Sequence, residues 1–133
     1  MTYLIDTDVF SAIAKARDAA LLRRVGRVRL EDLALSIVTI GEIRFGQALN
    51  PLAVRVRERI DVLVDSMRRL PLGWNAVPHY ASTRAHLQKK GTPIGPNDLW
   101  LAAHALAEDL TLVTANEREF TRVPKLRVEN WLR

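Results

Sequence analysis

Short apolar runs alternate with segments of helical periodicity along most of this chain. Three runs are typical of buried strands: residues 3–5 (YLI), 33–38 (LALSIV) and 111–114 (TLVT). Residues 127–130 (RVEN) favour a further strand near the end. Strands that alternate with helices indicate a parallel sheet with helices on both of its faces. We therefore predict a three-layer α/β/α sandwich around a central, mainly parallel sheet of about four to five strands.

Apolar residues three or four positions apart predict helices in the segments between these runs. The expected helices are residues 8–16, 19–26, 39–49, 52–70, 75–90 and 98–109. The longest of them carries apolar residues at helical spacing from Leu52 to Leu70. A turn is expected at residues 71–74 (PLGW), with a short strand just before it as an alternative to the end of this helix, and Gly91 is expected to end the helix at 75–90. No repeat, low-complexity stretch or long linker divides the chain, so residues 1–133 are expected to form a single domain.

The composition excludes some chemistry and favours a polyanionic partner. The chain has no cysteine, so it can form neither a disulfide framework nor a thiolate metal site. It carries 20 Lys and Arg against 15 Asp and Glu, a net charge of +5, which favours nucleic acid. The sequence has neither a signal-peptide pattern nor an apolar run long enough to span a membrane, so we expect a cytoplasmic protein without membrane contact.

Ligands of an open parallel sheet bind at the carboxyl ends of its strands, so the polar residues after each strand carry most weight. The first strand is followed by Asp-Thr-Asp at positions 6–8, and the second by Glu42. The third is followed by Asn116 and, a little beyond, by Glu119. Asp98 begins the helix that precedes the third strand. We therefore expect several acids and one amide to meet at one edge of the sheet.

Clustered carboxylates repel each other and lose solvation unless a positive group joins them. A hard divalent cation such as Mg²⁺ or Mn²⁺ meets that need, because it takes oxygen ligands and often uses only one or two carboxylates, waters and a substrate phosphate. Such a cation polarises a phosphoryl oxygen and lowers the pKa of a bound water. A cluster of acids in a chain with a net positive charge therefore points to the hydrolysis of phosphodiester bonds.

Each of these side chains also has a purely structural interpretation. Asp6 suits a turn at the end of a strand, and Asp8 suits the first turn of the next helix. Glu42 suits a solvated helix position, although its apolar neighbours favour one that faces the core. Asn116 suits a turn after a strand, and Glu119 suits a polar surface turn. Their joint placement favours a common site over these separate roles.

The helix that starts near residue 98 has a start signal of its own. Asn is a favoured N-cap, so Asn97 is expected to begin this helix and to leave Asp98 at the first helical position. The partial positive charge of the helix end stabilises an ionised carboxylate there, and an ionised carboxylate also suits a metal ligand. The histidines show no metal-ligand spacing, so we expect ordinary packing or exposure for them: His79, His86 and His104.

Three stretches of the chain resemble one known family. They are YLIDTDVFSAI at the start, LSIVTIGEIRFG at residues 35–46, and almost the whole of residues 84–132. On these stretches the chain resembles the PIN-domain family and, within it, the VapC-type toxins of bacterial toxin–antitoxin modules. The resemblance covers both ends and most of the chain, and leaves residues 50–80 as generic helix.

The resemblance implies a compact α/β fold and a Mg²⁺-dependent endoribonuclease, with Mn²⁺ as a substitute. It also implies a toxin that is held inactive by a cognate antitoxin and that forms a homodimer. The acids typical of the family fall here on Asp6, Glu42 and Asp98, and its more variable fourth catalytic position falls on Asn116. Asp6 and Asp98 are then direct metal ligands, and Glu42 ligates the metal or orients its water.

The resemblance gives supporting roles to the hydroxyls of Thr7 and Thr114. The chain departs from the family pattern at two positions: Asp8 replaces the asparagine common after Asp-Thr, and Asn116 lacks the negative charge of many members. Glu119 is the candidate for supplying the missing charge. With less charge at the fourth position, we expect one tightly held cation, with a second arriving alongside RNA.

The implied substrate is RNA, with structured RNA such as tRNA as a family-level expectation. Basic side chains would attract its phosphate backbone. The candidates are Arg84, Lys89, Lys90, Arg118 and Arg122.

Two other functions stay open at the level of sequence. The Asp-x-Asp after the first strand also occurs in haloacid-dehalogenase-like phosphatases, where the first Asp is a nucleophile and the second a general acid. That pattern expects Thr or Val where this chain has Phe10, and its later lysine and acid pair are not evident here. The second alternative is a PIN-like module that binds RNA or a partner without cutting, for which the neutral Asn116 leaves room.

Overall fold

The computed structural model describes residues 1–51 and 53–132, and in this part of the chain five parallel strands form one sheet. Their order in space is β3-β2-β1-β4-β5. The strands are β1 (Tyr3–Ile5), β2 (Leu33–Ser36), β3 (Arg68–Leu70), β4 (Thr111–Val113) and β5 (Val128–Glu129). The register pairs Ile5 of β1 with Val113 of β4, so the residues that follow these two central strands leave the sheet side by side.

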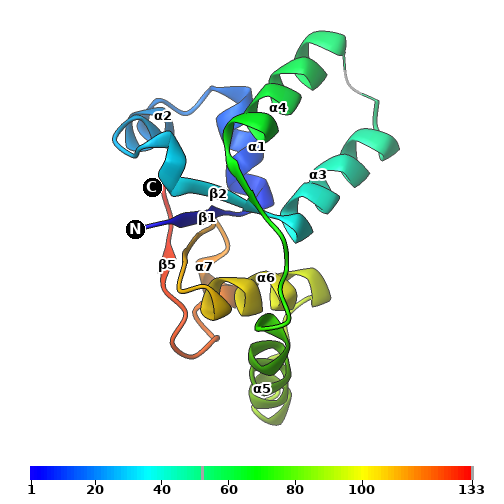
Figure 1. Ribbon diagram of the computed structural model, residues 1–133, viewed down its shortest axis with the longest axis vertical. Helices are drawn as coiled ribbons and strands as arrows, with labels where there is room; N and C mark the ends of the chain where they lie inside the picture. Colours follow the sequence, from blue (N-terminus) through cyan, green and yellow to red (C-terminus); the bar gives the residue numbers. More distant parts are fainter. Residues whose placement is uncertain (52, 133) are drawn as a thin grey trace.

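Helices cover both faces of the sheet, which confirms the predicted three-layer α/β/α sandwich (Figure 1). One layer contains α1 (Thr7–Lys15), α2 (Ala19–Gly26), α3 (Ile37–Leu49) and α4 (Val54–Ser66). The other contains α5 (Ala76–Lys89), α6 (Pro96–Ala107) and α7 (Glu117–Phe120). A short 3₁₀ helix, Leu30–Asp32, precedes β2. None of the helices in the described part of the chain is long and apolar enough to cross a membrane.

The side chains of each strand alternate between two apolar cores. The core beneath α1–α4 takes Ile5, Leu33, Leu35 and Val113 from the strands. The core beneath α5–α7 takes Leu4, Ala34 and Leu112. Because both faces of the central strands are buried, these strands read in the sequence as continuous apolar runs rather than as alternating ones. This double burial holds the ends of β1, β2 and β4 in fixed positions.

Two predicted boundaries are wrong, and side-chain chemistry explains the first. The run 33–38 is strand only as far as Ser36, because the Ser36 hydroxyl accepts a hydrogen bond from the Val38 backbone N–H at 3.1 Å and caps α3. Ile37 and Val38 therefore begin the helix despite their β-branched side chains. The predicted helix 52–70 is also too long.

In the observed structure α4 ends at Ser66, and Arg68–Leu70 form the edge strand β3 beside β2, which confirms the alternative of a short strand before the turn at 71–74. Apolar residues at 67 and 70 fit a helical period and a strand equally well, so periodicity alone could not separate them. The Leu52 end of the predicted helix lies outside the described residues.

The start of α6 also differs from the prediction. Gly95 is the N-cap and Pro96 the first helical residue, so Asn97 does not cap the helix. Proline favours this first position because its fixed φ suits a helix and its missing N–H is not needed there. Asp98 is therefore the third residue of α6, still within the first turn. The predicted stop after α5 is confirmed, with Gly91 at a φ of 71°.

Candidate active site

Asp6 lies directly beyond the central strand β1 and is the N-cap of α1. One carboxylate oxygen accepts the Thr7 backbone N–H at 2.6 Å, and the other accepts the Thr114 hydroxyl at 2.7 Å. Only 8% of Asp6 is exposed. Burial raises the pKa of Asp6 above its usual range; the two hydrogen bonds oppose that rise, and nearby Asp8 and Glu42 add to it. Asp6 is therefore a buried acid whose ionised form needs more positive charge than the protein supplies.

Glu42 reaches the same place from α3. The Thr7 hydroxyl donates to the Glu42 carboxylate at 2.9 Å, which joins α1 to α3. Glu42 is half-buried, as its apolar neighbours in the sequence indicate. Since Thr7 follows Asp6 directly, this one hydrogen bond keeps two acids of different elements close together.

Asp98 brings a third carboxylate from the first turn of α6. Its pKa is raised from 3.8 to about 7, first by burial and then by the charges of Glu119, Asp6 and Glu42. Asp98 and Glu119 also share a hydrogen bond. The electrostatic influence of these three acids on Asp98 shows that one site collects four carboxylates, as the strand-end argument predicts.

Glu119 and Asn116 complete the site after β4. The Gly95 backbone N–H donates to one Glu119 oxygen at 3.1 Å, and the Asn116 side-chain amide donates to the other. The Asn116 backbone N–H donates to the Thr114 hydroxyl at 3.0 Å. Thr114 is fully buried, so its hydroxyl links the turn that carries Asn116 to the carboxylate of Asp6. The bond from Gly95 was not evident in the sequence, because a backbone donor leaves no residue signature.

The charge of these acids is not balanced by basic side chains. Within residues 1–51 and 53–132, no Lys, Arg or His forms an ion pair with Asp6, Glu42, Asp98 or Glu119. Four half-buried or buried carboxylates in that state fit a bound cation. Among those described residues, no group of three or more His, Asp or Glu side chains is arranged to hold a metal ion by itself. This open arrangement fits Mg²⁺, which keeps several waters and needs only one or two carboxylates.

A cleft opens beside Glu42. It has a volume of about 450 Å³ and lies between α3 and the start of α6, where its lining residues include Ile37, Gly41, Phe45 and Asn97. Ile37 is 54% exposed and Phe45 is 66% exposed. This apolar rim was not predicted from the sequence, where its only signal was the lack of a polar outer face in the helix at 39–49. The cleft gives the acids an open side where a polymer or a protein segment can approach.

The remaining predicted residues occupy less central positions. Asp8 is exposed and acts on the site through its charge near Asp6. Arg118, Lys89 and Lys90 are exposed. Arg122 donates to the carbonyl oxygen of Pro93 at 3.3 Å, which places its charge beside the loop that leads into α6.

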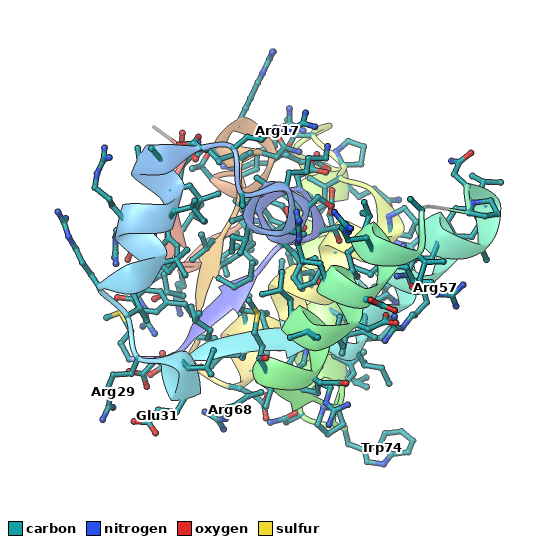
Figure 2. The ribbon with its side chains drawn as sticks, turned by 90° about the horizontal axis from the view of Figure 1, so that it is seen from above. Arg17, Arg29, Glu31, Arg57, Arg68 and Trp74 are labelled. Carbon is teal, nitrogen blue, oxygen red and sulfur yellow. The ribbon has the colours of Figure 1, made fainter. Side chains whose placement is uncertain are left out.

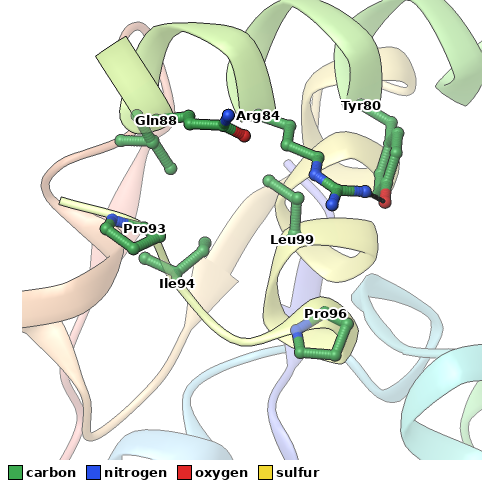
Figure 3. A pocket seen from close by; sticks show the side chains of 8 residues that line it. Tyr80, Arg84, Gln88, Pro93, Ile94, Pro96 and Leu99 are labelled. Atoms are coloured by element: carbon green, nitrogen blue, oxygen red, sulfur yellow. Dashed lines mark hydrogen bonds between the residues drawn. The ribbon is translucent and has the colours of Figure 1, made fainter. Parts of the chain in front are cut away.

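Arg84 lies on the rim of a second cleft, of about 290 Å³, between α5 and the loop before α6 (Figure 3). Its guanidinium donates to the Tyr80 hydroxyl at 2.8 Å, and Figure 3 shows the two side chains side by side. Pro96 and Leu99, which flank Asp98 in the sequence, also line this cleft. An arginine beside a ring is suited to contact with phosphate or with a base.

Comparisons with known proteins agree with this fold. The PIN domain family model matches residues 3–126. The chain is 31% identical over 132 residues to Ribonuclease VapC2 of Rickettsia felis, covering 98% of each chain. It is 28% identical over 131 residues to the tRNA(fMet)-specific endonuclease VapC of Salmonella typhimurium, again covering 98% of each. The structure of VapBC-1 from nontypeable Haemophilus influenzae matches with a TM-score of 0.88 at 30% identity and covers 100% of both chains.

The chain therefore belongs to the PIN-domain family of nucleases. Within that family it is a member of the VapC group of toxin–antitoxin ribonucleases. This membership confirms the resemblance predicted from the sequence and removes the phosphatase alternative, since the Asp-x-Asp after β1 belongs to a PIN fold.

Proposed function

We propose that this chain cleaves RNA internally with the aid of Mg²⁺ and acts as the toxin of a toxin–antitoxin pair. One observation carries the proposal: four carboxylates that pair with no basic side chain of the described residues meet at the carboxyl ends of the central strands of a PIN domain. The chain as a whole is basic, with a net charge of +5, which suits a polyanionic substrate. Mn²⁺ is expected to replace Mg²⁺, because both take oxygen ligands.

Asp6, Asp98 and Glu42 are the proposed metal ligands, and Asn116 is the fourth catalytic position. A bound Mg²⁺ supplies charge that polarises a phosphoryl oxygen and lowers the pKa of a water. Asp6 is held in place for this role by the Thr114 hydroxyl at 2.7 Å, and Glu42 by the Thr7 hydroxyl at 2.9 Å.

Glu119 places a fourth negative charge beside Asp98 and is itself oriented by Asn116 and the Gly95 backbone N–H. We therefore propose that Glu119 compensates for the neutral side chain at Asn116. A single tightly held cation, joined by a second one when RNA binds, fits this charge. Asp8 adds a more distant negative charge near Asp6.

The proposed substrate is structured RNA, and the relatives named as tRNA(fMet)-specific endonucleases make tRNA the first one to test. The candidate phosphate contacts are the exposed or half-exposed basic residues around α5 and α7: Arg84, Lys89, Lys90, Arg118 and Arg122. Each phosphate contact made by such a residue strengthens binding and makes it more dependent on salt.

The proposed protein partner is a cognate antitoxin. Similar solved structures are those of VapBC complexes, and the cleft beside Glu42 offers exposed apolar side chains next to the acids. A segment that enters this cleft would cover Ile37 and Phe45 and block the approach to the carboxylates.

We also propose a homodimer that acts in the cytoplasm, where its RNA substrate is found. Trp74, just before α5, and Val77, in its first turn, are exposed and line a cleft with Trp100. Trp74 is 91% exposed and projects away from the fold (Figure 2), which makes this face the candidate surface for a second copy.

The test is cleavage of purified tRNA and total RNA by the isolated protein, with Mg²⁺ in one arm and EDTA in the other, followed by mapping of the new ends. Defined internal cuts that need the metal, and that disappear in Asp6→Asn, support the proposal. Glu31→Gln is the matched control, because Glu31 is exposed and pairs with Arg29. RNA binding without metal-dependent cuts would instead identify a non-catalytic binding module.

A further inference from the structure

A buried histidine joins the two helices that carry Glu42 and Asp98. His104 lies in α6 and is 1% exposed. Its Nδ1 lies 2.8 Å from the hydroxyl of Ser36, and its Nε2 lies 2.9 Å from a carboxylate oxygen of Glu108. Ser36 is itself fully buried, ends β2 and caps α3. A polar chain thus runs from the start of α3, through the core, to the C-terminal end of α6.

The hydrogen bonds of this chain assign the proton of the ring. The Glu108 carboxylate can only accept, so Nε2 carries the proton and donates to it. In a ring that carries this single proton, Nδ1 is an acceptor and takes the hydroxyl proton of Ser36. The Ser36 oxygen remains able to accept the Val38 backbone N–H at 3.1 Å. Every polar side-chain atom of His104 and Ser36 is therefore satisfied, which removes the cost of burying them and makes their geometry specific.

Other hydrogen bonds already tie together the remaining elements of the active site. The bond between Thr114 and Asp6 ties the end of β4 to α1, and the bond between Thr7 and Glu42 ties α1 to α3. Glu119 ties α7 to the start of α6 through the Gly95 backbone. Within the described residues, the bond from His104 to the cap of α3 is the side-chain hydrogen bond that joins α3 and α6. It closes the ring of elements around the acids.

We propose that His104 is a positioning residue that sets the spacing between Glu42 on α3 and Asp98 on α6, so that both face one divalent cation. The proposal rests on the proposed metal-dependent function. Like charges on the two helices repel each other before the cation binds, and a buried polar link with one satisfied geometry resists their separation. Apolar packing alone would hold the helices together but would tolerate small shifts along the interface.

The decisive measurement is the Mn²⁺ affinity of the intact protein, obtained by titration calorimetry or from the electron paramagnetic resonance signal of free Mn²⁺. It is made at a temperature well below the melting temperature of each variant. His104→Leu keeps most of the volume and removes both hydrogen bonds. We expect its Mn²⁺ affinity to fall about tenfold, as when a residue that orients metal ligands is lost. We expect kcat on RNA to fall with it, while KM stays unchanged because the proposed RNA contacts lie on the surface.

Leu101→Val is the matched control for stability. Leu101 lies on the same helix, is 1% exposed and packs in the core beneath α5–α7, so its truncation weakens packing without touching the polar chain. We expect a lower melting temperature for this control with unchanged Mn²⁺ affinity. His104→Asn can keep the bond to Ser36, because its amide reaches the place of Nδ1, and we expect it to recover most of the Mn²⁺ affinity.

Unchanged Mn²⁺ affinity in folded His104→Leu, or an equal loss in Leu101→Val, would show that His104 only fills the core and would overturn the proposal. If His104→Leu does not fold, Ser36→Ala and His104→Asn decide the question, since the proposal requires weaker Mn²⁺ binding in the first and near-normal binding in the second. A parent protein that neither binds Mn²⁺ nor cleaves RNA overturns the proposed function as well. If the parent protein binds Mn²⁺ and cleaves RNA, the results for the variants test the role of His104 alone.

Discussion

Replacing Asp98 by Asn should make the metal-free protein more stable while it abolishes cleavage. The pKa of Asp98 is raised from 3.8 to about 7 by burial and by the neighbouring acids. The shift of roughly three units corresponds to about 4 kcal/mol at about 1.36 kcal/mol per unit. Asp98 is only half-buried, so solvent screening reduces this to about 2 kcal/mol. The substitution also removes a favourable charge at the start of α6, worth about 0.5 kcal/mol, which leaves a net gain of roughly 1.5 kcal/mol.

The pH dependence follows from the sign of the shift. An acid whose pKa is higher in the folded state binds its proton more tightly there, so the metal-free parent gains stability from this group at low pH and loses it as pH rises from about 4 to about 7. The amide of the Asp98→Asn variant cannot titrate, so the variant does not show this loss. The two proteins should therefore be equally sensitive to pH below about 4, and the advantage of the variant should reach its full size above pH 7.

The assay is urea and thermal unfolding of both proteins between pH 4 and 8.5 in EDTA, repeated with Mg²⁺. In EDTA at pH 8 the variant should melt roughly 5 °C higher. With Mg²⁺ the order should reverse, because the cation stabilises only a protein that binds it, by about 2.7 kcal/mol at a hundredfold excess over Kd. An Asp98→Asn variant that is no more stable than the parent above pH 7 in EDTA, or one that Mg²⁺ stabilises equally, would refute the reasoning.

Three further predictions concern single contacts of the site. Glu119→Gln removes a like charge beside Asp98, so it should lower the pKa of Asp98. It should also raise the Mg²⁺ concentration needed for half-maximal cleavage. An unchanged Mg²⁺ concentration would show that Glu119 is not part of the site. Thr114→Val removes the hydrogen bond that the Thr114 hydroxyl donates to buried Asp6. It should lower the free energy of unfolding in urea by about 1–3 kcal/mol and weaken Mg²⁺ binding. Arg84→Ala should weaken binding to all RNA sequences alike and lower the slope of log K against log salt by about 1, as measured by fluorescence anisotropy at several salt concentrations.

The positions of the acids could be predicted because the strands of this fold are marked clearly in the sequence. β1, β2 and β4 are buried on both faces, so each appears as an apolar run, and parallel pairing brings their carboxyl ends together. Asp6, Glu42 and Asp98 are assigned to one edge on that ground, and the structure brings them within electrostatic range of each other. The prediction depends on chain topology, which short apolar runs define well.

The hydrogen bonds that orient these acids could not be predicted in the same way. The hydroxyl of Ser36 had two possible roles, in a strand or as a helix cap, and tertiary context decided for the cap. Asn97 is a good N-cap by propensity, but Pro96 occupies the first helical position and moves the cap to Gly95. His104 lacks metal-ligand spacing, and only its position opposite Ser36 reveals a polar role in the core. Such pairings join residues far apart in the sequence, where local patterns carry no information.

The arrangement around Asn116 explains how a site can keep its charge when its fourth position is neutral. The amide of Asn116 donates to Glu119, which lies one helical turn further along the chain, and the Gly95 backbone holds the other oxygen of Glu119. A carboxylate at position 116 could not make this contact, since it would repel Glu119 rather than bind it. Asn116 and Glu119 therefore form a matched pair, and Asn116→Asp alone should impair Mg²⁺ binding, whereas the double change with Glu119→Gln should restore it. An Asn116→Asp variant with tighter Mg²⁺ binding would show that the two positions act independently.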